Sequence, residues 1–100
     1  MKKLYNCNAQ FDEKNFDLVS YSTTVIHIEF DGDAGEWLCA IYRASNTTMQ
    51  HIRKYYKYLY SHDRQVVAKL IETAYRLSIA EKERNGVLHY DVITGEIYFA

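Results

Sequence analysis

The sequence predicts an α+β fold: an antiparallel sheet of four to five strands in the order β-β-β-α-α-β-β, with two helices packed on one face. Three observations support this prediction. Apolar residues alternate in the first 42 positions, recur every three or four positions between residues 47 and 84, and alternate again near the end. All four glycines fall at expected turns, and the chain contains no proline. With 100 residues and no shift in composition, the chain is expected to form one domain over residues 1–100.

Three strands are expected in the first part of the chain. Residues 3–11 and 23–30 each place apolar side chains on one face and polar side chains on the other, which is typical of an antiparallel strand with one side in water. Residues 36–42 are apolar on both faces, and this favours a central position in the sheet. A charged turn at residues 12–17 and a glycine-containing turn at residues 31–35 connect the three strands.

Two helices are expected to follow. The first covers residues 47–60 and begins with a capping box formed by Thr47 and Gln50. The second is the longer one, covers residues 63–84 and ends at Asn85-Gly86. We expect it to cross the single core with a stripe formed by Val66, Val67, Leu70, Ala74 and Leu77.

A hairpin is expected to close the sheet. Residues 87–91 and 96–99 form its strands, and residues 92–95 form its loop. Gly95 supplies the positive φ angle that such a loop usually needs.

Composition excludes several classes of protein. The chain is 48% hydrophobic and 25% charged, as in a globular protein, and its net charge of −1 gives no general attraction to nucleic acid or membranes. No stretch approaches the roughly 20 apolar residues needed to span a bilayer, and no apolar segment of a signal peptide follows the first lysines. Cys7 and Cys39 are too few for a disulfide framework. We therefore expect a cytoplasmic protein.

No motif indicates a metal, a cofactor or a catalytic group. Asp31-x-Asp33 is similar to the start of a calcium loop, but Tyr42 stands where the loop needs its last glutamate. No serine has the Gly-x-Ser-x-Gly setting of a nucleophile, and no glycine-rich phosphate loop is present. The expected protein is therefore not an enzyme and carries no cofactor.

The four histidines have no spacing typical of metal ligands. His27 and His89 lie in expected strands and are interpreted as half-buried. His51 and His62 flank the first helix and are expected to be exposed.

The first helix offers the clearest candidate surface. Residues 43–64 have a net charge of +4, whereas residues 1–42 have a net charge of −4. The outer face of helix 47–60 is expected to carry His51, Arg53, Lys54, Lys57 and Tyr58. Cations with an exposed aromatic ring could hold phosphates and stack a base, although solvated helix faces commonly carry lysine and arginine as well.

Two other surfaces are candidates. The turn with Asp31, Asp33 and Glu36 is acidic and could occupy the positively charged nucleic-acid groove of a partner. On the long helix, Tyr75 and Ile79 belong to a second apolar strip. Either the first helix covers this strip, or the two residues are exposed and form a homodimer contact.

These features favour a non-enzymatic protein-binding module that acts by steric occlusion. The alternative is weak nucleic-acid binding by the basic, tyrosine-rich helix 47–60. No family is indicated by motif. Lone compact domains without catalytic motifs are typical of small proteins encoded by phages and plasmids, and many of these, anti-CRISPR proteins included, block host machinery. The expected partner is a protein or a protein–nucleic-acid complex.

Overall fold

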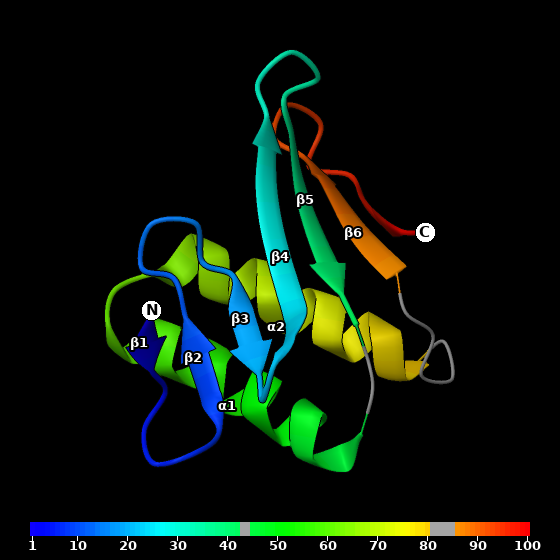
Figure 1. Ribbon diagram of the computed structural model, residues 1–100. Helices are drawn as coiled ribbons and strands as arrows, with labels where there is room; N and C mark the ends of the chain where they lie inside the picture. Colours follow the sequence, from blue (N-terminus) through cyan, green and yellow to red (C-terminus); the bar gives the residue numbers. More distant parts are fainter. Residues whose placement is uncertain (43–44, 81–85) are drawn as a thin grey trace.

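A seven-stranded antiparallel sheet and two helices make up the fold (Figure 1), in a computed structural model that describes residues 1–42, 45–80 and 86–100. Each strand pairs with the next strand of the chain, and the helices lie between the fifth and sixth strands in sequence. The strands are β1 (Lys2–Lys3), β2 (Ala9–Phe11), β3 (Leu18–Ser20), β4 (Thr23–Asp31), β5 (Glu36–Ile41), β6 (Gly86–Asp91) and β7 (Ile97–Phe99). The helices are α1 (Asn46–Ser61) and α2 (Gln65–Ala80). The predicted α+β class is confirmed, with more strands than the expected four to five.

The expected strand 3–11 is interrupted. Leu4 is fully buried, and the amide of Leu4 donates to the carbonyl of Ala9 at 2.9 Å, so the chain reverses within this segment. Tyr5 has a φ of +52°, in the left-handed region that no strand residue adopts. The segment therefore forms the two short strands β1 and β2, and Cys7 lies in the turn between them instead of in a strand.

Strand β3 was not predicted. It is three residues long, too short to show a period of two, and a tight turn at Tyr21 (φ +58°) connects it to β4. Leu18 and Ser20 point into the core and are buried. Residues 18–20 thereby join the N-terminal strands to the rest of the sheet.

Helix α1 begins slightly earlier than the capping box suggested. Ser45 is the N-cap residue, and its hydroxyl accepts a hydrogen bond from the amide of Thr48 at 3.1 Å. The cap predicted at Thr47 is therefore wrong, because Thr47 already lies within the helix. The buried face of α1 includes Met49, Ile52, Tyr56 and Leu59, as expected, and also Tyr55.

The core-facing side of α2 is rotated from the predicted stripe. Val66 was expected in the core but is 60% exposed, whereas Ala68 and Ile71 are fully buried. Helix α2 contacts both α1 and strands β5 and β6, so its buried side is centred between these two neighbours. Of the helix end expected at Asn85-Gly86, residue 85 lies outside the described residues. Gly86 does not close the helix as predicted, because it is the first residue of strand β6 and has no positive φ.

The β4–β5 and β6–β7 hairpins turn at the same end of the sheet, and this end projects beyond the helices (Figure 1). The two turns share the pattern Asp-x-x-x-Gly-Glu. The carboxylate of Asp31 accepts hydrogen bonds from the amides two and three residues further on, and that of Asp91 does the same in the second turn. Gly35 (φ +64°) and Gly95 (φ +76°) adopt the left-handed conformation that completes each turn. The predicted closing hairpin is confirmed.

Candidate functional site

A row of four apolar side chains crosses the projecting end of the sheet on its helix-covered side. Phe30 pairs with Trp37, Trp37 with Tyr90, and Tyr90 with Ile97, so the row extends over four adjacent strands in register. The neighbouring row, two residues inward along each strand, lies beneath the helices; it consists of Ile28, Cys39, Leu88 and Phe99. We call the four outer residues the apolar row.

The apolar row is largely open to solvent, unlike the inner row. Phe30 is 52% exposed and Ile97 is 49% exposed, while Trp37 and Tyr90 are half-buried. The rings of Phe30 and Trp37 pack on each other with centroids 4.9 Å apart. The row is exposed because the hairpins extend beyond the helix layer that covers the rest of this face (Figure 1).

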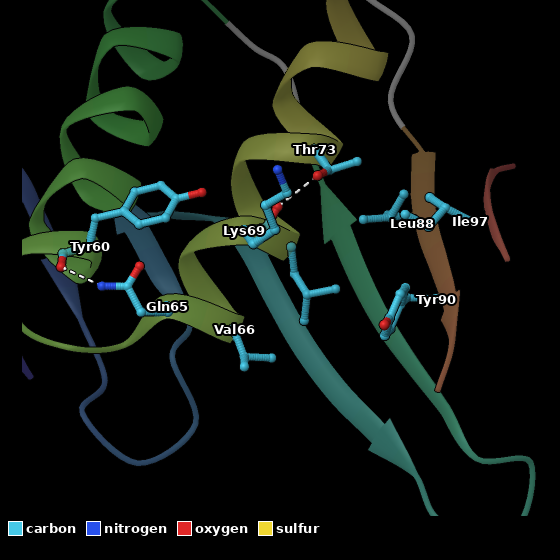
Figure 2. A pocket seen from close by; sticks show the side chains of 9 residues that line it. Tyr60, Gln65, Val66, Lys69, Thr73, Leu88, Tyr90 and Ile97 are labelled. Atoms are coloured by element: carbon cyan, nitrogen blue, oxygen red, sulfur yellow. Dashed lines mark hydrogen bonds between the residues drawn. The ribbon is translucent and has the colours of Figure 1, made fainter. Parts of the chain in front are cut away.

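A groove adjoins the apolar row where α2 faces strands β6 and β7 (Figure 2). Its volume is about 460 Å³. The helices contribute Tyr60, Gln65, Val66, Lys69, Leu70 and Thr73, and the strands contribute Leu88, Tyr90 and Ile97. We call this groove the α2 groove. Tyr90 and Ile97 belong both to the apolar row and to the α2 groove, so the row and the groove form one continuous surface.

Two polar contacts fix the helical wall of the α2 groove. The side-chain amide of Gln65 donates to the carbonyl of Tyr60 at 3.0 Å, across the turn between the helices (Figure 2). The hydroxyl of Thr73 donates to the carbonyl of Lys69 at 2.7 Å. Each contact holds a side chain of the wall against a backbone carbonyl of a helix, and the groove is present in the free chain.

The predicted basic face of α1 is present in part. Arg53, Lys54 and Lys57 are exposed on the outer side of the helix. His51, which was expected to be exposed, is only 4% exposed, and its Nδ1 lies 2.8 Å from the hydroxyl of Ser20. His51 points into the core because α1 packs against β3 at this position. It therefore cannot join the contact surface proposed for this helix.

Tyr58 is half-buried and its ring is already in contact with other rings. His62 stacks on it with ring centroids 3.9 Å apart, and Phe11 lies 5.0 Å from it. Tyr5 meets the ring edge-on, and the ammonium of Lys2 lies 5.9 Å from the ring centroid. The expectation of an outward-facing ring ready to stack a base is therefore corrected: Tyr58 ties the N-terminal segment to α1.

The predicted acidic turn lies at the projecting end of the sheet. Asp31 and Asp33 are exposed, and the carboxylate of Glu36 lies 2.7 Å from Nδ1 of His89. The turn is far from the basic face of α1 (Figure 1), so the structure does not bring the two predicted surfaces together. It does bring the acidic turn next to the apolar row, since Asp31 directly follows Phe30.

The other histidines differ in burial. His89 is half-buried as expected and stacks flat on Tyr98, with ring centroids 4.4 Å apart. His27 is more exposed than expected, because its ring lies on the surface between Asp17 and Glu29 at 2.8 Å from each. The two carboxylates raise the pKa of His27. His62 is exposed, as expected.

The two residues of the predicted dimer contact, Tyr75 and Ile79, differ in exposure. Tyr75 is half-buried and packs edge-on against Tyr56 of α1, with ring centroids 5.8 Å apart. Ile79 is 46% exposed. The first helix thus covers part of this strip, and a dimer through Ile79 stays a prediction.

Ser20 and His51 form a buried pair that resembles a nucleophile with its base. Both side chains are buried, at 3% and 4% exposure, and the ring of Tyr21 lies 5.7 Å from that of His51. Burial, together with the charge of Lys54, lowers the pKa of His51, so the ring is held neutral. A substrate cannot reach the hydroxyl of Ser20, and the pair is best explained as a hydrogen bond that joins β3 to α1.

Within residues 1–42, 45–80 and 86–100, no group of three or more His, Cys, Asp or Glu side chains is arranged to hold a metal ion. The thiol of Cys39 is fully buried, and burial raises its pKa to about 12, so this thiol is unreactive at neutral pH. Neither helix that the structure describes is long and apolar enough to cross a bilayer.

Sequence reasoning did not single out the apolar row. A signal for it exists in the repeated turn pattern, because Phe30 and Trp37 directly flank one Asp-x-x-x-Gly-Glu turn, and Tyr90 and Ile97 directly flank the other. Each turn fixes its hairpin register, which places the two flanking residues opposite each other.

Comparison of the chain with protein-family models, with curated proteins and with solved structures gave no match.

Proposed function

We propose that this protein is a non-enzymatic protein-binding module that acts by steric occlusion, and that it binds its partner through the apolar row and the α2 groove. The observation that carries the proposal is the row of Phe30, Trp37, Tyr90 and Ile97, in register on four strands and open to solvent. Contiguous exposed apolar surface of this kind usually marks a binding site in a protein.

The chemistry of this surface suits a protein partner. Tryptophan, tyrosine and phenylalanine dominate the centres of protein interfaces because they bury a large area and lose little conformational freedom. Trp37 and Tyr90 are half-buried already, so they present rigid rings at the centre of the row. The more exposed Phe30 and Ile97 lie at its two ends, and Val66 adds apolar surface on the opposite wall of the groove.

Occlusion is the mode of action that fits the remaining observations. The serine–histidine pair of Ser20 and His51 is sealed in the core. The exposed pair of Ser61 and His62, 3.1 Å apart at the C-terminal end of α1, has both side chains against the carbonyl of Tyr58 and lies outside the α2 groove. A domain of this kind can act by covering a surface that its partner needs. We therefore retain the proposal of a cytoplasmic inhibitor of host machinery, encoded by a phage or a plasmid and similar in mode of action to anti-CRISPR proteins.

Weak nucleic-acid binding by α1 is the second candidate, and one observation favours it: Arg53, Lys54 and Lys57 are all exposed on one side of the helix. Three cations that neutralise about three phosphates would give a logarithmic salt slope of roughly −2 to −3. The engaged ring of Tyr58 counts against this candidate, because base stacking would have to displace His62.

A capture experiment tests the first proposal. The immobilised wild-type chain and the Phe30→Ser/Ile97→Ser variant are exposed to extract of the cell in which the protein is made. The control is Tyr21→Ser/Tyr42→Ser, which removes two exposed aromatic side chains away from the apolar row. We expect one partner protein to be retained by the wild type and the control and lost by the first variant. Equal retention by all three would contradict the proposed surface.

A titration separates the two candidates. Mixed-sequence single and double strands are added to the wild type and to Lys54→Glu/Lys57→Glu at about 50 and about 150 mM salt. We expect no binding at the higher salt. Micromolar binding that is lost in the charge-reversed variant would favour the nucleic-acid candidate instead.

A further inference from the structure

We infer that the partner segment that occupies the apolar row is basic: a protein surface that presents lysine or arginine side chains around an apolar anchor. This inference rests on the proposed function and specifies the partner's chemistry. It starts from the position of the two Asp-x-x-x-Gly-Glu turns. They follow the apolar row directly along the strands, at the projecting end of the sheet.

The turns make this end of the molecule strongly acidic. Residues 30–36 and 90–97 contain five carboxylates and no lysine or arginine; the five are Asp31, Asp33, Glu36, Asp91 and Glu96. The turns also pack on each other, since the amide of Val92 donates to the carbonyl of Gly35 at 3.0 Å. The carboxylates of the two hairpins therefore gather at the projecting end of the sheet beside the apolar row, although the whole chain has a net charge of only −1. Asp31, Glu36 and Asp91 form the register row next to the apolar row, so they lie at the same end but on the opposite face of the sheet.

The five carboxylates have different roles. Asp31 and Asp91 accept the amides of their own turns, and hydrogen bonds of this kind lower the pKa of Asp91. Glu36 is paired with His89. Asp33 and Glu96 contribute only their backbone groups to the turns, and both residues are exposed. These last two can turn toward a partner without loss of the hairpin structure.

Charge complementarity selects the occupant. An apolar anchor fills the row and the groove, while cations around it meet the acidic turns; Lys69, on the helical wall, suits an acceptor on the partner. A second copy of this chain fits less well, because a two-fold contact places the same surface on itself and brings the acidic turns of both copies together. Nucleic acid is repelled from this end for the same reason.

Three synthetic helical peptides of about 16 residues, roughly four turns, serve as probes. The first carries leucine on one face and lysine on the other, the second carries leucine and glutamate, and the third carries serine and lysine. Binding to the full chain is measured by fluorescence anisotropy at about 50 and about 300 mM salt. Sedimentation velocity on the free chain, at the same concentrations, measures self-association.

Three variants accompany the wild type. Phe30→Ser/Ile97→Ser removes the exposed ends of the apolar row. Asp33→Asn/Glu96→Gln removes two charges beside the row and leaves the residues that hold the turns. The control, Glu13→Gln/Asp63→Asn, removes the same charge elsewhere; both residues are exposed, and asparagine tolerates the positive φ of Asp63 (+58°).

We expect the leucine–lysine peptide alone to bind the wild type. Asp33→Asn/Glu96→Gln should weaken its binding about three- to tenfold at low salt and less at high salt. The control variant should stay within about twofold, and Phe30→Ser/Ile97→Ser should lose at least about tenfold.

The contrary outcomes separate the two proposals. Equal binding of the lysine and glutamate peptides, with full dependence on Phe30 and Ile97, would overturn the basic partner and leave the docking surface intact. Leucine–lysine binding that ignores Phe30→Ser/Ile97→Ser would overturn the docking surface itself. Equal binding of the serine–lysine peptide would reduce the effect to general attraction of a polycation and contradict the inference. A wild-type dimer that Phe30→Ser/Ile97→Ser dissociates would assign the surface to a second copy.

Discussion

The hydroxyl of Ser20 lies 2.8 Å from Nδ1 of His51, in a contact that joins strand β3 to helix α1 inside the core. Thr48 extends the contact, with its hydroxyl 3.4 Å from that of Ser20. Buried polar groups are stabilising only when they are paired, so this cluster fixes how α1 lies on the sheet.

The neutral state of His51 predicts a pH dependence of stability. Burial lowers the pKa of His51 from its ordinary value of 6.5, so between the two values the unfolded chain binds a proton that the folded chain does not. The free energy of unfolding should therefore decrease as pH falls below about 6.5. In His51→Gln this part of the decrease should be absent, which urea unfolding of both proteins between about pH 5 and 8 would measure. If the free energy of unfolding changes with pH in the same way in both proteins, the lowered pKa of His51 would be contradicted.

A second prediction concerns Tyr55, which is fully buried at the centre of α1. Its hydroxyl donates to the carbonyl of Phe16 at 2.8 Å, and its ring lies 5.3 Å from that of Phe11. Tyr55→Phe should lower the free energy of unfolding by about 0.5–1.5 kcal/mol, because it removes the hydrogen bond and keeps the ring. Tyr42→Phe is the matched control at an exposed position and should change nothing measurable by urea unfolding. Equal effects at both positions would show that the Tyr55–Phe16 bond is unimportant.

Two glycines should respond differently to the same substitution. A Cβ atom at Gly86 would lie 2.6 Å from the ring of Phe99 and 2.9 Å from the carbonyl of Ala100, whereas nothing lies within 4 Å of one at Gly32. Gly86→Ala should therefore destabilise the chain by about 1–3 kcal/mol, since the last strand must shift. Gly32→Ala should be nearly neutral. Thermal unfolding compares the two, and a Gly86→Ala variant as stable as Gly32→Ala would contradict the close packing of β6 on β7.

The rotation of α2 gives a further test. Ile71→Ala should cost about 2–5 kcal/mol, because Ile71 is fully buried and its truncation leaves a cavity. Val66→Ala should cost less than about 0.5 kcal/mol, since Val66 is largely exposed on the groove wall. If chemical denaturation shows a larger loss of stability for Val66→Ala than for Ile71→Ala, the core-facing stripe predicted from the sequence would be correct instead.

Periodicity in the sequence and the glycine-containing loop at residues 92–95 were sufficient for the fold class, both helices and the closing hairpin, because amphipathic segments and turn residues are local signals. They failed where tertiary contacts decide the outcome. Strand β3 is too short to show a period, and Leu4 is buried while the chain around it turns. The side of α2 that faces the core depends on the position of α1, which a helical wheel does not contain.

The candidate site was predicted only in part. The acidic turn was identified from its charges, and Arg53, Lys54 and Lys57 are exposed as expected. The burial of His51 and the contacts of Tyr58 depend on strands that come together from distant parts of the chain. The apolar row depends on strand register and on how far the helices reach along the sheet, and only the three-dimensional arrangement combines these two facts.

Photo-crosslinking in the cell tests the central proposal most directly. A benzophenone-bearing phenylalanine replaces Phe30 or Ile97 in the apolar row, and Tyr21 or Tyr42 at exposed control positions. We predict that irradiation joins the chain, from positions 30 and 97 only, to one partner whose adduct is destroyed by protease and resists nuclease. Adducts formed only from positions 21 and 42, or adducts that nuclease removes, would contradict a protein-binding surface at the apolar row.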